Sequence, residues 1–273
     1  MCKLKSAIVL KDRVYCPDHD SHDRMLTELG IKDAYNNASS LFVRIELSPT
    51  DSRADSDVDG WKLKVDQDIL PDWWVEEVDV PRVRAAVKAW CGVHVLRDGY
   101  HKLIDGKWYL YGNASAELYN SASAELYNSA SAELYNSASA KLYNSASAKL
   151  YNSASAKLYG NASAKLYGSA SAELYNSASA KLYGNASAKL YGNASAELYN
   201  SASAKLYGNA SAELYNSASA KLYDSASANL YDSASAILPA NSCGNSTATV
   251  QDSAVLINHK THEITSLVEW KMV

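Results

Sequence analysis

The sequence predicts a mainly β protein, in which a β-solenoid (β-helix) of octapeptide repeats follows a small α+β domain. Two observations carry this prediction. From Tyr111 to Tyr231 a tyrosine recurs every eight residues, which accounts for 16 of the 20 tyrosines. All six tryptophans and the one phenylalanine lie outside residues 111–238. A mixed globular segment is therefore followed by a regular array of repeats.

The repeated unit is Tyr-[Gly/Asn/Asp]-[Asn/Ser]-Ala-Ser-Ala-[Lys/Glu]-Leu. A helix does not suit it, because eight residues at about 100° each leave successive leucines about 80° apart, and no buried stripe forms. An even repeat keeps the alternation of a strand from unit to unit. In the first unit Ala114, Ala116 and Leu118 share one face, and Glu117 lies on the other. Since the variable charged position must face water, we expect the Ala-Ala-Leu face to be buried.

The Tyr-x-x triplet supplies the corners, because Gly, Asn and Asp tolerate positive φ. One octad cannot bury its face alone, so we expect octads to stack into coils. Two octads make a 16-residue coil with two flat sides, which we favour, and three octads in a triangular coil are the alternative. Because Ala and Ser are poor strand formers, a silk-like or disordered array is a further alternative.

Charged positions form two columns if each coil consists of two octads. One column runs from Glu117 to Asn229 and the other from Glu125 to Ile237, and like charges adjoin in both. Each such contact costs fractions of a kcal/mol in water. The columns therefore predict a solvated face that tolerates charge.

We expect three segments: an α+β module and solenoid cap at 1–110, the solenoid at 111–258, and a C-terminal cap at 259–273. The register slips by four residues at 239–242, after which Cys243 and Gln251 stand where tyrosine belongs. These two degenerate octads are expected to form a last coil. Because a bare sheet edge would polymerise, we expect 259–273, with Trp270, to cover one end, and the segment through Trp108 and Tyr109 to cover the other.

The N-terminal module shows its own elements. Residues 6–15 (SAIVLKDRVY) indicate a hairpin or two short strands, and residues 41–47 and 61–65 indicate further strands. A short helix is expected over 22–29, with Asp20 or Ser21 as its cap and Gly30 at its end. A second helix is expected from Asp79 to about Trp90, with Pro81 near its first position and Gly92 beyond its end.

The densest chemical cluster is Cys16-Pro-Asp-His-Asp-Ser-His22. A metal site or an acid–base pair is one interpretation. A polar loop that caps the following helix is the interpretation we favour, since the spacing matches no metal motif. The sequence thus predicts no metal, with His19 and His22 as the candidates should one bind.

Aromatic residues supply the candidate binding positions. Trp73-Trp74 is either a docking patch or core packing against the helix of residues 81–90, which we favour. The candidate binding residues are Trp73, Trp74, Tyr111, Tyr119, Tyr127, Tyr135, Tyr143, Tyr151, Tyr159 and Tyr167.

Composition limits the remaining classes. The formal charge of −4 points neither to nucleic acid nor to an acidic partner. The four cysteines lack a C-x-x-C pair, so free thiols are expected. With no run of about 18 apolar residues and too short an apolar start for a secretion signal, we expect a cytoplasmic protein that does not bind membranes. Because a phosphate-binding glycine loop, G-x-S-x-G and H-E-x-x-H are all missing, neither a cofactor nor an enzymatic activity is expected.

Two stretches carry a resemblance: Thr247-Ala-Thr-Val-Gln-Asp-Ser-Ala254 and Ile8-Val-Leu-Lys-Asp-Arg-Val-Tyr-Cys-Pro17. They resemble bacterial and phage-encoded octapeptide-repeat proteins with a short globular N-terminal module, a group that implies a β-solenoid but no activity. Tyr-Gly-Asn/Ser and the 16-residue period are similar to bacterial ice-nucleation proteins. The Thr-x-Thr pair of those proteins is replaced here by Ala-x-Ala, as in Ala162 and Ala164, which disfavours ice binding.

The sequence therefore favours a non-enzymatic repeat scaffold or binding protein, a rigid rod with the N-terminal module as its interaction end. The partner is an unknown protein or a second copy of the chain. Self-assembly through tyrosine columns is the first alternative. Binding of ice or ordered water by the Ser/Asn rows is the second, and an enzyme using His19, Asp20 and His22 is the third.

Overall fold

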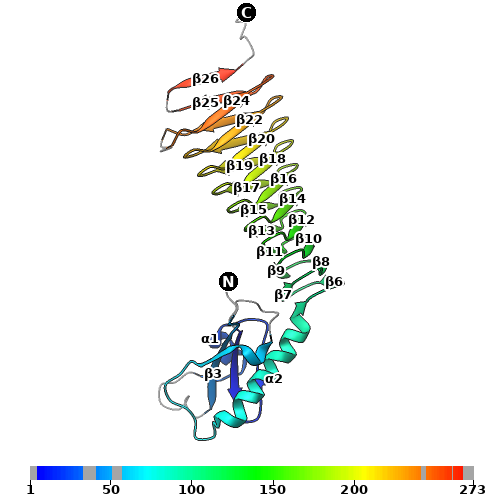
Figure 1. Cartoon of the computed structure of the whole chain (residues 1–273), viewed down its shortest axis with the longest axis vertical. Coiled ribbons are helices and arrows are strands. Elements are labelled where there is room, and N and C mark those ends of the chain that lie inside the picture. The colour runs from blue at the N-terminus through cyan, green and yellow to red at the C-terminus, as the bar shows by residue number, and fades with distance from the viewer. Residues whose placement is uncertain (1–4, 33–40, 51–56, 241–243, 260, 267–273) are drawn as a thin grey trace, which may run out of the picture. The chain divides into compact units, whose positions relative to one another are not determined.

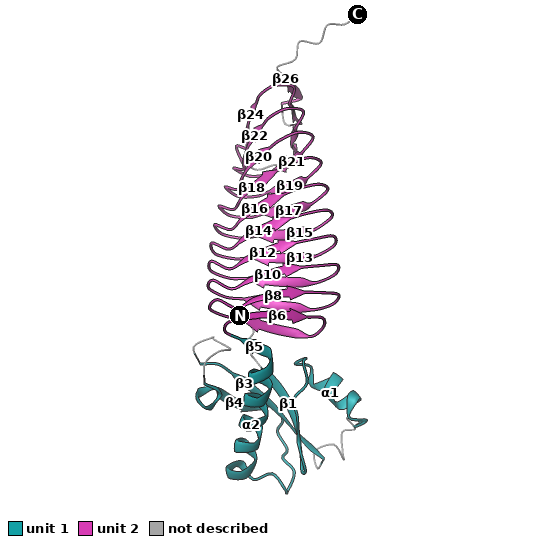
Figure 2. Cartoon of the chain, turned by 90° about the vertical axis from the view of Figure 1, so that its right-hand side faces the viewer, with its two compact units in different colours: residues 1–96 teal, residues 97–273 magenta. Residues whose placement is uncertain are grey.

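The structure is a computed structural model and describes residues 5–32, 41–50, 57–240, 244–259 and 261–266. The chain forms two compact units, residues 1–96 and 97–273, which Figure 2 distinguishes by colour. The division falls earlier than the boundary at residue 110 that the composition suggested.

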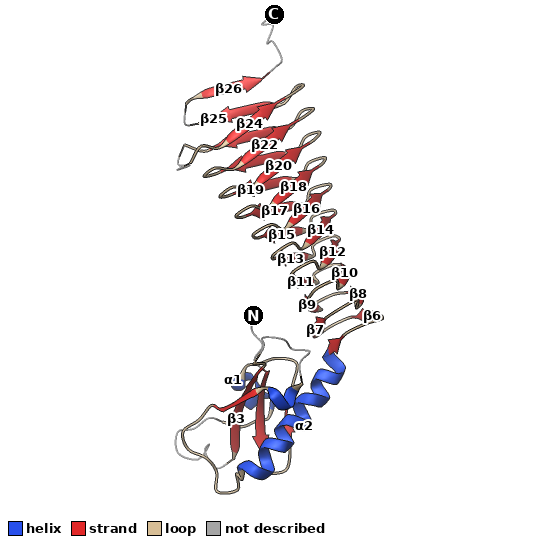
Figure 3. Ribbon diagram, viewed as in Figure 1, coloured by secondary structure: helices blue, strands red, loops and turns tan. Residues whose placement is uncertain are grey.

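The described part of the first unit holds a four-stranded antiparallel sheet in the order β2-β1-β3-β4 (Figure 3). Its strands are β1 (Lys5–Leu10), β2 (Val14–Tyr15), β3 (Phe42–Ser48) and β4 (Lys62–Val65). The predicted hairpin is confirmed, since Val9 pairs with Val14 across the turn. β1 lies between two partners and is buried over five successive residues, as expected of a strand covered on both faces.

Helix α1 (His22–Glu28) agrees with the prediction, and Ser21 is its cap. The Ser21 hydroxyl accepts a hydrogen bond from the backbone N–H of Arg24, which would otherwise lack a partner. Met25 and Leu26 on its inner face pack with Ile8 of β1 and Phe42 of β3. The helix therefore completes the small hydrophobic core of this unit.

Helix α2 (Glu76–His94) is longer than predicted at both ends. Asp79 does not begin it: its carboxylate reaches back and accepts a hydrogen bond from the N–H of Val75, at 2.9 Å. Pro81 is the sixth helical residue and costs one backbone hydrogen bond there. Gly92 lies inside the helix, because buried Trp90 and Cys91 hold the last turn. A 3-10 turn, η2 (Val58–Gly60), and strand β5 (Val95–Leu96) complete the described elements of this unit.

The second unit is the β-solenoid (Figure 1). It begins with β6 (Tyr100–Leu103) and β7 (Lys107–Leu110). Sixteen strands follow in residues 115–238, all of them described, and each spans the Ser-to-Leu part of one octad, from β8 (Ser115–Leu118) through β23 (Ser235–Leu238). The even octad period therefore does produce strands, as predicted.

Two parallel sheets make the solenoid, one from the even-numbered strands and the other from the odd-numbered strands. Ser131 pairs with Ser147 and Leu134 with Leu150, so neighbours in one sheet are two octads apart. The even sheet, as described, has ten strands from β6 to β24 (Thr247–Val250), which makes ten coils, and the sixteen regular octads form eight of them at two octads in each coil. The two-octad coil is confirmed and the triangular alternative is wrong.

The core of the solenoid is the Ala-Ala-Leu face. In one central octad Ala154 and Leu158 have no solvent exposure and Ala156 is 5% exposed. Small side chains bring the two sheets close, and leucine fills the remaining space. Burial of one leucine contributes about 1.5–3 kcal/mol, and the array repeats that contribution twice in each coil.

The corners follow the predicted backbone. The residue after each tyrosine has positive φ, whether it is Asn120 (52°), Gly160 (71°) or Asp224 (57°). The N–H of Ala122 donates to the carbonyl of Tyr119 at 3.0 Å and closes the turn. Only these three residue types occupy the position within 112–232, because each accepts the left-handed conformation at low cost.

The first coil precedes the repeats. β7 pairs in register with β9 (Ser123–Leu126), with Trp108 beside Ala124 and Leu110 beside Leu126. Residues through Trp108 and Tyr109 were expected to cover the solenoid, but they form part of its first coil. Buried Leu103 and Leu110 take the place of the octad leucines there.

The last coil confirms the predicted slip of the register. Ser227 pairs with Thr247, which lies farther along the chain than the two octads that separate other neighbours. The N–H of Gln251 donates to the carbonyl of Leu230 at 2.9 Å, as a repeat tyrosine would. β25 (Val255–Asn258) ends the parallel ladder, and β26 (Glu263–Ser266) lies antiparallel along its edge. Part of the predicted C-terminal cap is thus present as β26, while Cys243 and Trp270 lie outside the described residues.

Candidate functional site: the outer faces of the solenoid

Tyrosines form two stacked columns on the solenoid. Consecutive rings within a column have centroids 4.6 to 5.2 Å apart and planes within 11° of parallel. Of the predicted binding tyrosines, Tyr111, Tyr127, Tyr143 and Tyr159 share one column, and Tyr119, Tyr135, Tyr151 and Tyr167 share the other. Each ring face inside a column is covered by the next ring. Tyr111 and Tyr127 are buried, and the other tyrosines offer a partner ring edges and hydroxyls, not open aromatic faces.

Every glutamate of the octads accepts a hydrogen bond from a tyrosine. In residues 115–238 the glutamate occupies the charged position six times, and the hydroxyl of the tyrosine two residues later donates to it over 2.6 to 2.9 Å. Sequence reasoning missed these bonds. The spacing contained the evidence, because residues i and i+2 of a strand lie on one face.

The charged positions stack in the two predicted columns, and like charges do adjoin, as Lys141 and Lys157 do. Opposite charges in these columns also pair with each other, which was not predicted. Wherever a glutamate meets a lysine of the next coil within residues 115–238, the two form an ion pair of 2.8 to 3.4 Å, five pairs in all. The lysine heads are about half exposed, so each pair contributes only tenths of a kcal/mol.

Glu173 is the most heavily bonded of these carboxylates. Lys157 and Tyr175 donate to it, and Lys189 adds a third contact, which together hold its pKa at about 2. Burial and the bond to Glu173 raise the pKa of Tyr175 to about 12. Burial and the carboxylate of Glu125 likewise raise the pKa of Tyr127 far above its ordinary value. Tyr175 and Tyr127 therefore stay neutral through the physiological pH range.

A groove runs along the outer face of each sheet. The groove of the odd-numbered strands has a volume of about 760 Å³ and that of the even-numbered strands about 910 Å³. Each is lined by serine, alanine and the charged position of one strand after another. A long, repetitive, open surface of this kind suits an extended ligand or another regular surface, and it lacks the enclosure that most small-molecule sites have.

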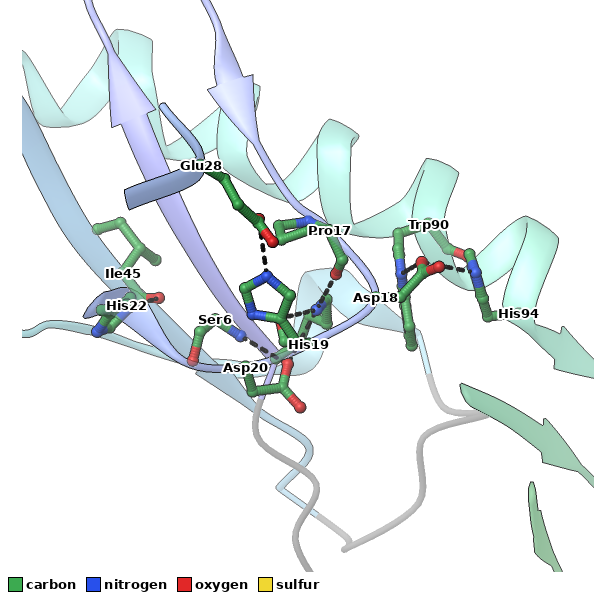
Figure 4. Close-up of polar contacts among 11 residues, drawn as sticks. Ser6, Pro17, Asp18, His19, Asp20, His22, Glu28, Ile45, Trp90 and His94 are labelled. Atoms are coloured by element: carbon green, nitrogen blue, oxygen red, sulfur yellow. Dashed lines mark hydrogen bonds and ion pairs between the residues drawn. The ribbon is translucent and has the colours of Figure 1, made fainter. Parts of the chain in front are cut away.

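The cluster at residues 16–22 is divided among separate partners (Figure 4). His19 lies 2.9 Å from Glu28, whose carboxylate also accepts from Tyr15. Asp20 pairs at 2.9 Å with the buried ammonium of Lys5, which also donates to the carbonyls of residues 17 and 19. His22 instead lies beside the carbonyl of Ile45, at 3.2 Å. The favoured loop interpretation is consistent with this arrangement, since the three candidate side chains do not converge.

One metal-ligand arrangement is present around His22. Ligand atoms of His22, Glu46 and Asp66 all lie within 4.8 Å of one another. Lys64 lies beside both carboxylates, with its ammonium 2.6 Å from Asp66 and 3.7 Å from Glu46, and its single positive charge offsets one of their two negative charges. His19, the other candidate of the sequence, is not part of this group.

The other candidates are less organised. Trp73 and Trp74 are half-buried, while Trp61 and Trp90 lie in the buried core. Cys16 is a free thiol, and burial raises its pKa to about 11, which keeps it protonated, while Cys91 is buried. Cys2 lies outside the described residues.

None of the described helices combines the length and apolarity needed to cross a membrane. No protein-family model, curated protein or solved structure gives a significant match to this chain. The class of the molecule is therefore defined by its fold alone. It is a β-solenoid with tyrosine ladders, which is a repeat-scaffold fold.

Proposed function

We propose that the chain is a non-enzymatic scaffold, a rigid β-solenoid that spaces or presents the small N-terminal module, which binds a protein partner. One observation carries the proposal: the eight coils of regular octads, in continuous ladders, repeat the same buried contacts and the same outer groups. An enzyme needs a few unlike groups brought to one place. The solenoid instead repeats one set of groups along its length.

The N-terminal module is the better candidate for partner recognition because its surface is irregular. Half-buried Trp73 and Trp74 precede α2, and Ile69 nearby is 67% exposed. Tryptophan and exposed apolar side chains are enriched where proteins bind one another. This surface presents an irregular set of side chains that a partner could recognise specifically, which the repeats do not.

The test uses three full-length chains in affinity capture with mass spectrometry. The first is the natural chain, the second lacks residues 147–162, and the third carries Trp73→Ala and Trp74→Ala. Removing two whole octads takes out one coil and leaves every later strand in its sheet. The proposal expects the shortened chain to capture the same proteins and the tryptophan variant to lose them. The reverse pattern would refute it.

Self-assembly is the second candidate, favoured by the half-exposed edges of the tyrosine columns. Because neighbouring rings cover the faces, two molecules would meet through edges and hydroxyls. Light scattering at rising concentration separates this role from the first: a constant monomer mass contradicts it. Ice binding is disfavoured by the exposed lysines beside each serine row, which keep their own hydration.

A further inference from the structure

The two grooves of the solenoid differ in charge although their backbones are alike. The groove of the odd-numbered strands, from Lys107 to Ile237, contains six lysines and two glutamates, a formal charge of +4. The groove of the even-numbered strands contains three lysines and four glutamates, a formal charge of −1. The whole chain carries −4. A basic face is thus present on an acidic protein, and the net charge of the whole chain does not reveal it.

The charge of the odd-strand groove is concentrated toward one part of the array. Its two glutamates are already paired, Glu125 with Lys141 and Glu173 with Lys157 and Lys189. Lys205 and Lys221 come next, adjacent to each other across the ladder. Neither has a carboxylate partner among the described residues, and both are exposed. Together with Lys189 they form a row of three ammonium groups, one in each successive coil.

The groove also offers one serine hydroxyl in each coil beside the lysine row. Ser187 and Ser203 are exposed, and the backbone of the buried alanines between the two rows lines the groove. The spacing of both rows is that of neighbouring strands, about 4.8 Å. A matching ligand therefore carries anionic and hydroxyl groups that repeat at nearly this distance along a straight chain.

We propose that the groove of the odd-numbered strands binds an extended, β-linked polysaccharide that carries carboxylates. A β-1,4-linked pyranose unit in an extended chain advances by close to one strand spacing, so one ring lies over each coil. Because successive rings face opposite edges of the chain, a carboxylate meets the lysine row at every second coil and hydroxyls meet the lysine and serine rows between. This site rests on the proposed binding role of the chain and assigns a ligand class to its array.

Other polyanions fit the groove less well. Proteins that hold single-stranded nucleic acid stack its bases on free aromatic faces, but each tyrosine face inside the columns is covered by another ring, as in Tyr191 and Tyr207. The groove lining also includes no arginine, the side chain best suited to phosphate. An acidic peptide advances about 3.3 Å per residue in extended form and falls out of step with the coils.

The repeats provide a matched pair of variants for the test. Lys205 lies between Lys189 and Lys221 in the odd sheet, and Lys165 lies between Lys149 and Lys181 in the even sheet. Both are exposed. In either variant, Lys205→Glu or Lys165→Glu, the new carboxylate gains two lysine neighbours, so the fold is retained, and circular dichroism checks this.

The probe is a β-1,4-linked mannuronate oligomer, titrated calorimetrically into full-length chains at low ionic strength. We expect binding that weakens with salt, an affinity loss of about tenfold or more in Lys205→Glu, and little change in Lys165→Glu. A β-1,4-glucose oligomer of equal length is expected not to bind.

Three results would each overturn the assignment: no binding of mannuronate, equal losses in the two variants, or equally tight binding of polyglutamate or single-stranded DNA. If Lys205→Glu does unfold, Lys205→Gln replaces it with the same expectations. The outcome is separate from partner capture by the N-terminal module, because that assay depends on Trp73 and Trp74.

Discussion

The hydroxyl of Tyr175 donates a hydrogen bond to Glu173 Oε2 over 2.9 Å. Glu173 also pairs with Lys157 of the preceding coil at 3.0 Å and with Lys189 of the following coil at 3.4 Å. One carboxylate thus connects three coils on the outer face of the sheet, opposite the buried Ala-Ala-Leu face. The charged position of the octad therefore supports the ladder at the places where glutamate and lysine alternate.

The first prediction concerns alkaline pH and the variant Glu173→Gln. In the natural chain the pKa of Tyr175 is raised to about 12 from 10.0, so its contribution to folding is complete below pH 10 and is lost as pH rises through about 12. Removing the carboxylate charge lets this tyrosine ionise at lower pH. Tyrosinate absorbance across a pH titration measures the shift. The control Lys205→Gln, which leaves Glu173 in place, keeps the natural curve; an unchanged curve for Glu173→Gln contradicts the argument.

The second prediction concerns acid and the first unit. Hydrogen bonds from His19, Tyr15 and Arg24 lower the pKa of Glu28 from 4.5 to about 2. A lowered carboxyl pKa stabilises the folded state above pH 4.5, and this stabilisation is lost as pH falls through about 2. We expect Glu28→Gln to be less stable than the natural chain at pH 7, with the difference shrinking toward pH 2. Urea unfolding at a series of pH values measures it, and a difference that grows on acidification would show the sign to be wrong.

The third prediction concerns the core of the solenoid. Leu158 has no solvent exposure and lies in the middle of the array. We expect Leu158→Ala to lower the free energy of unfolding by about 2–5 kcal/mol, because it leaves a cavity between the two sheets. Ser155→Ala, in the same strand but on the outer face, is expected to change it by about 0.5 kcal/mol or less. Equal unfolding midpoints for the two variants in denaturant would contradict the assigned burial of the Ala-Ala-Leu face.

The octad repeat was sufficient to predict the solenoid because an even period keeps the same residues on the same face of every strand. The first coil was not predicted, because its two strands lack this repeated pattern. Tyr100–Leu103 shares only Lys102 and Leu103 with an octad strand, and Lys107–Leu110 shares only Leu110, which is too little to show the period. The pairing of these strands with the repeats becomes evident only in the ladder.

Contacts of individual side chains, not the residue pattern, account for the other differences. The start of α2 depends on the carboxylate of Asp79 reaching the N–H of Val75. The cluster at 16–22 divides because buried Lys5 attracts Asp20, while β3 lies against His22. No local pattern contains these contacts. The tyrosine–glutamate hydrogen bonds are different, since the alternation of side chains in a strand would have been enough to predict them.

The last prediction concerns the corners and uses Gly160, where φ is 71°. A β-carbon there would lie 3.5 Å from the backbone of Asn144, an ordinary contact, so space does not forbid a side chain. The left-handed backbone does penalise a β-branched one, and we expect Gly160→Val to cost about 1–2 kcal/mol. Gly160→Asn places the residue that Asn144 shows at the same corner of the preceding coil, with φ of 60°, and is expected to cost little. Thermal unfolding of the two variants decides the matter: if asparagine costs as much as valine, packing between corners, not backbone conformation, limits this position.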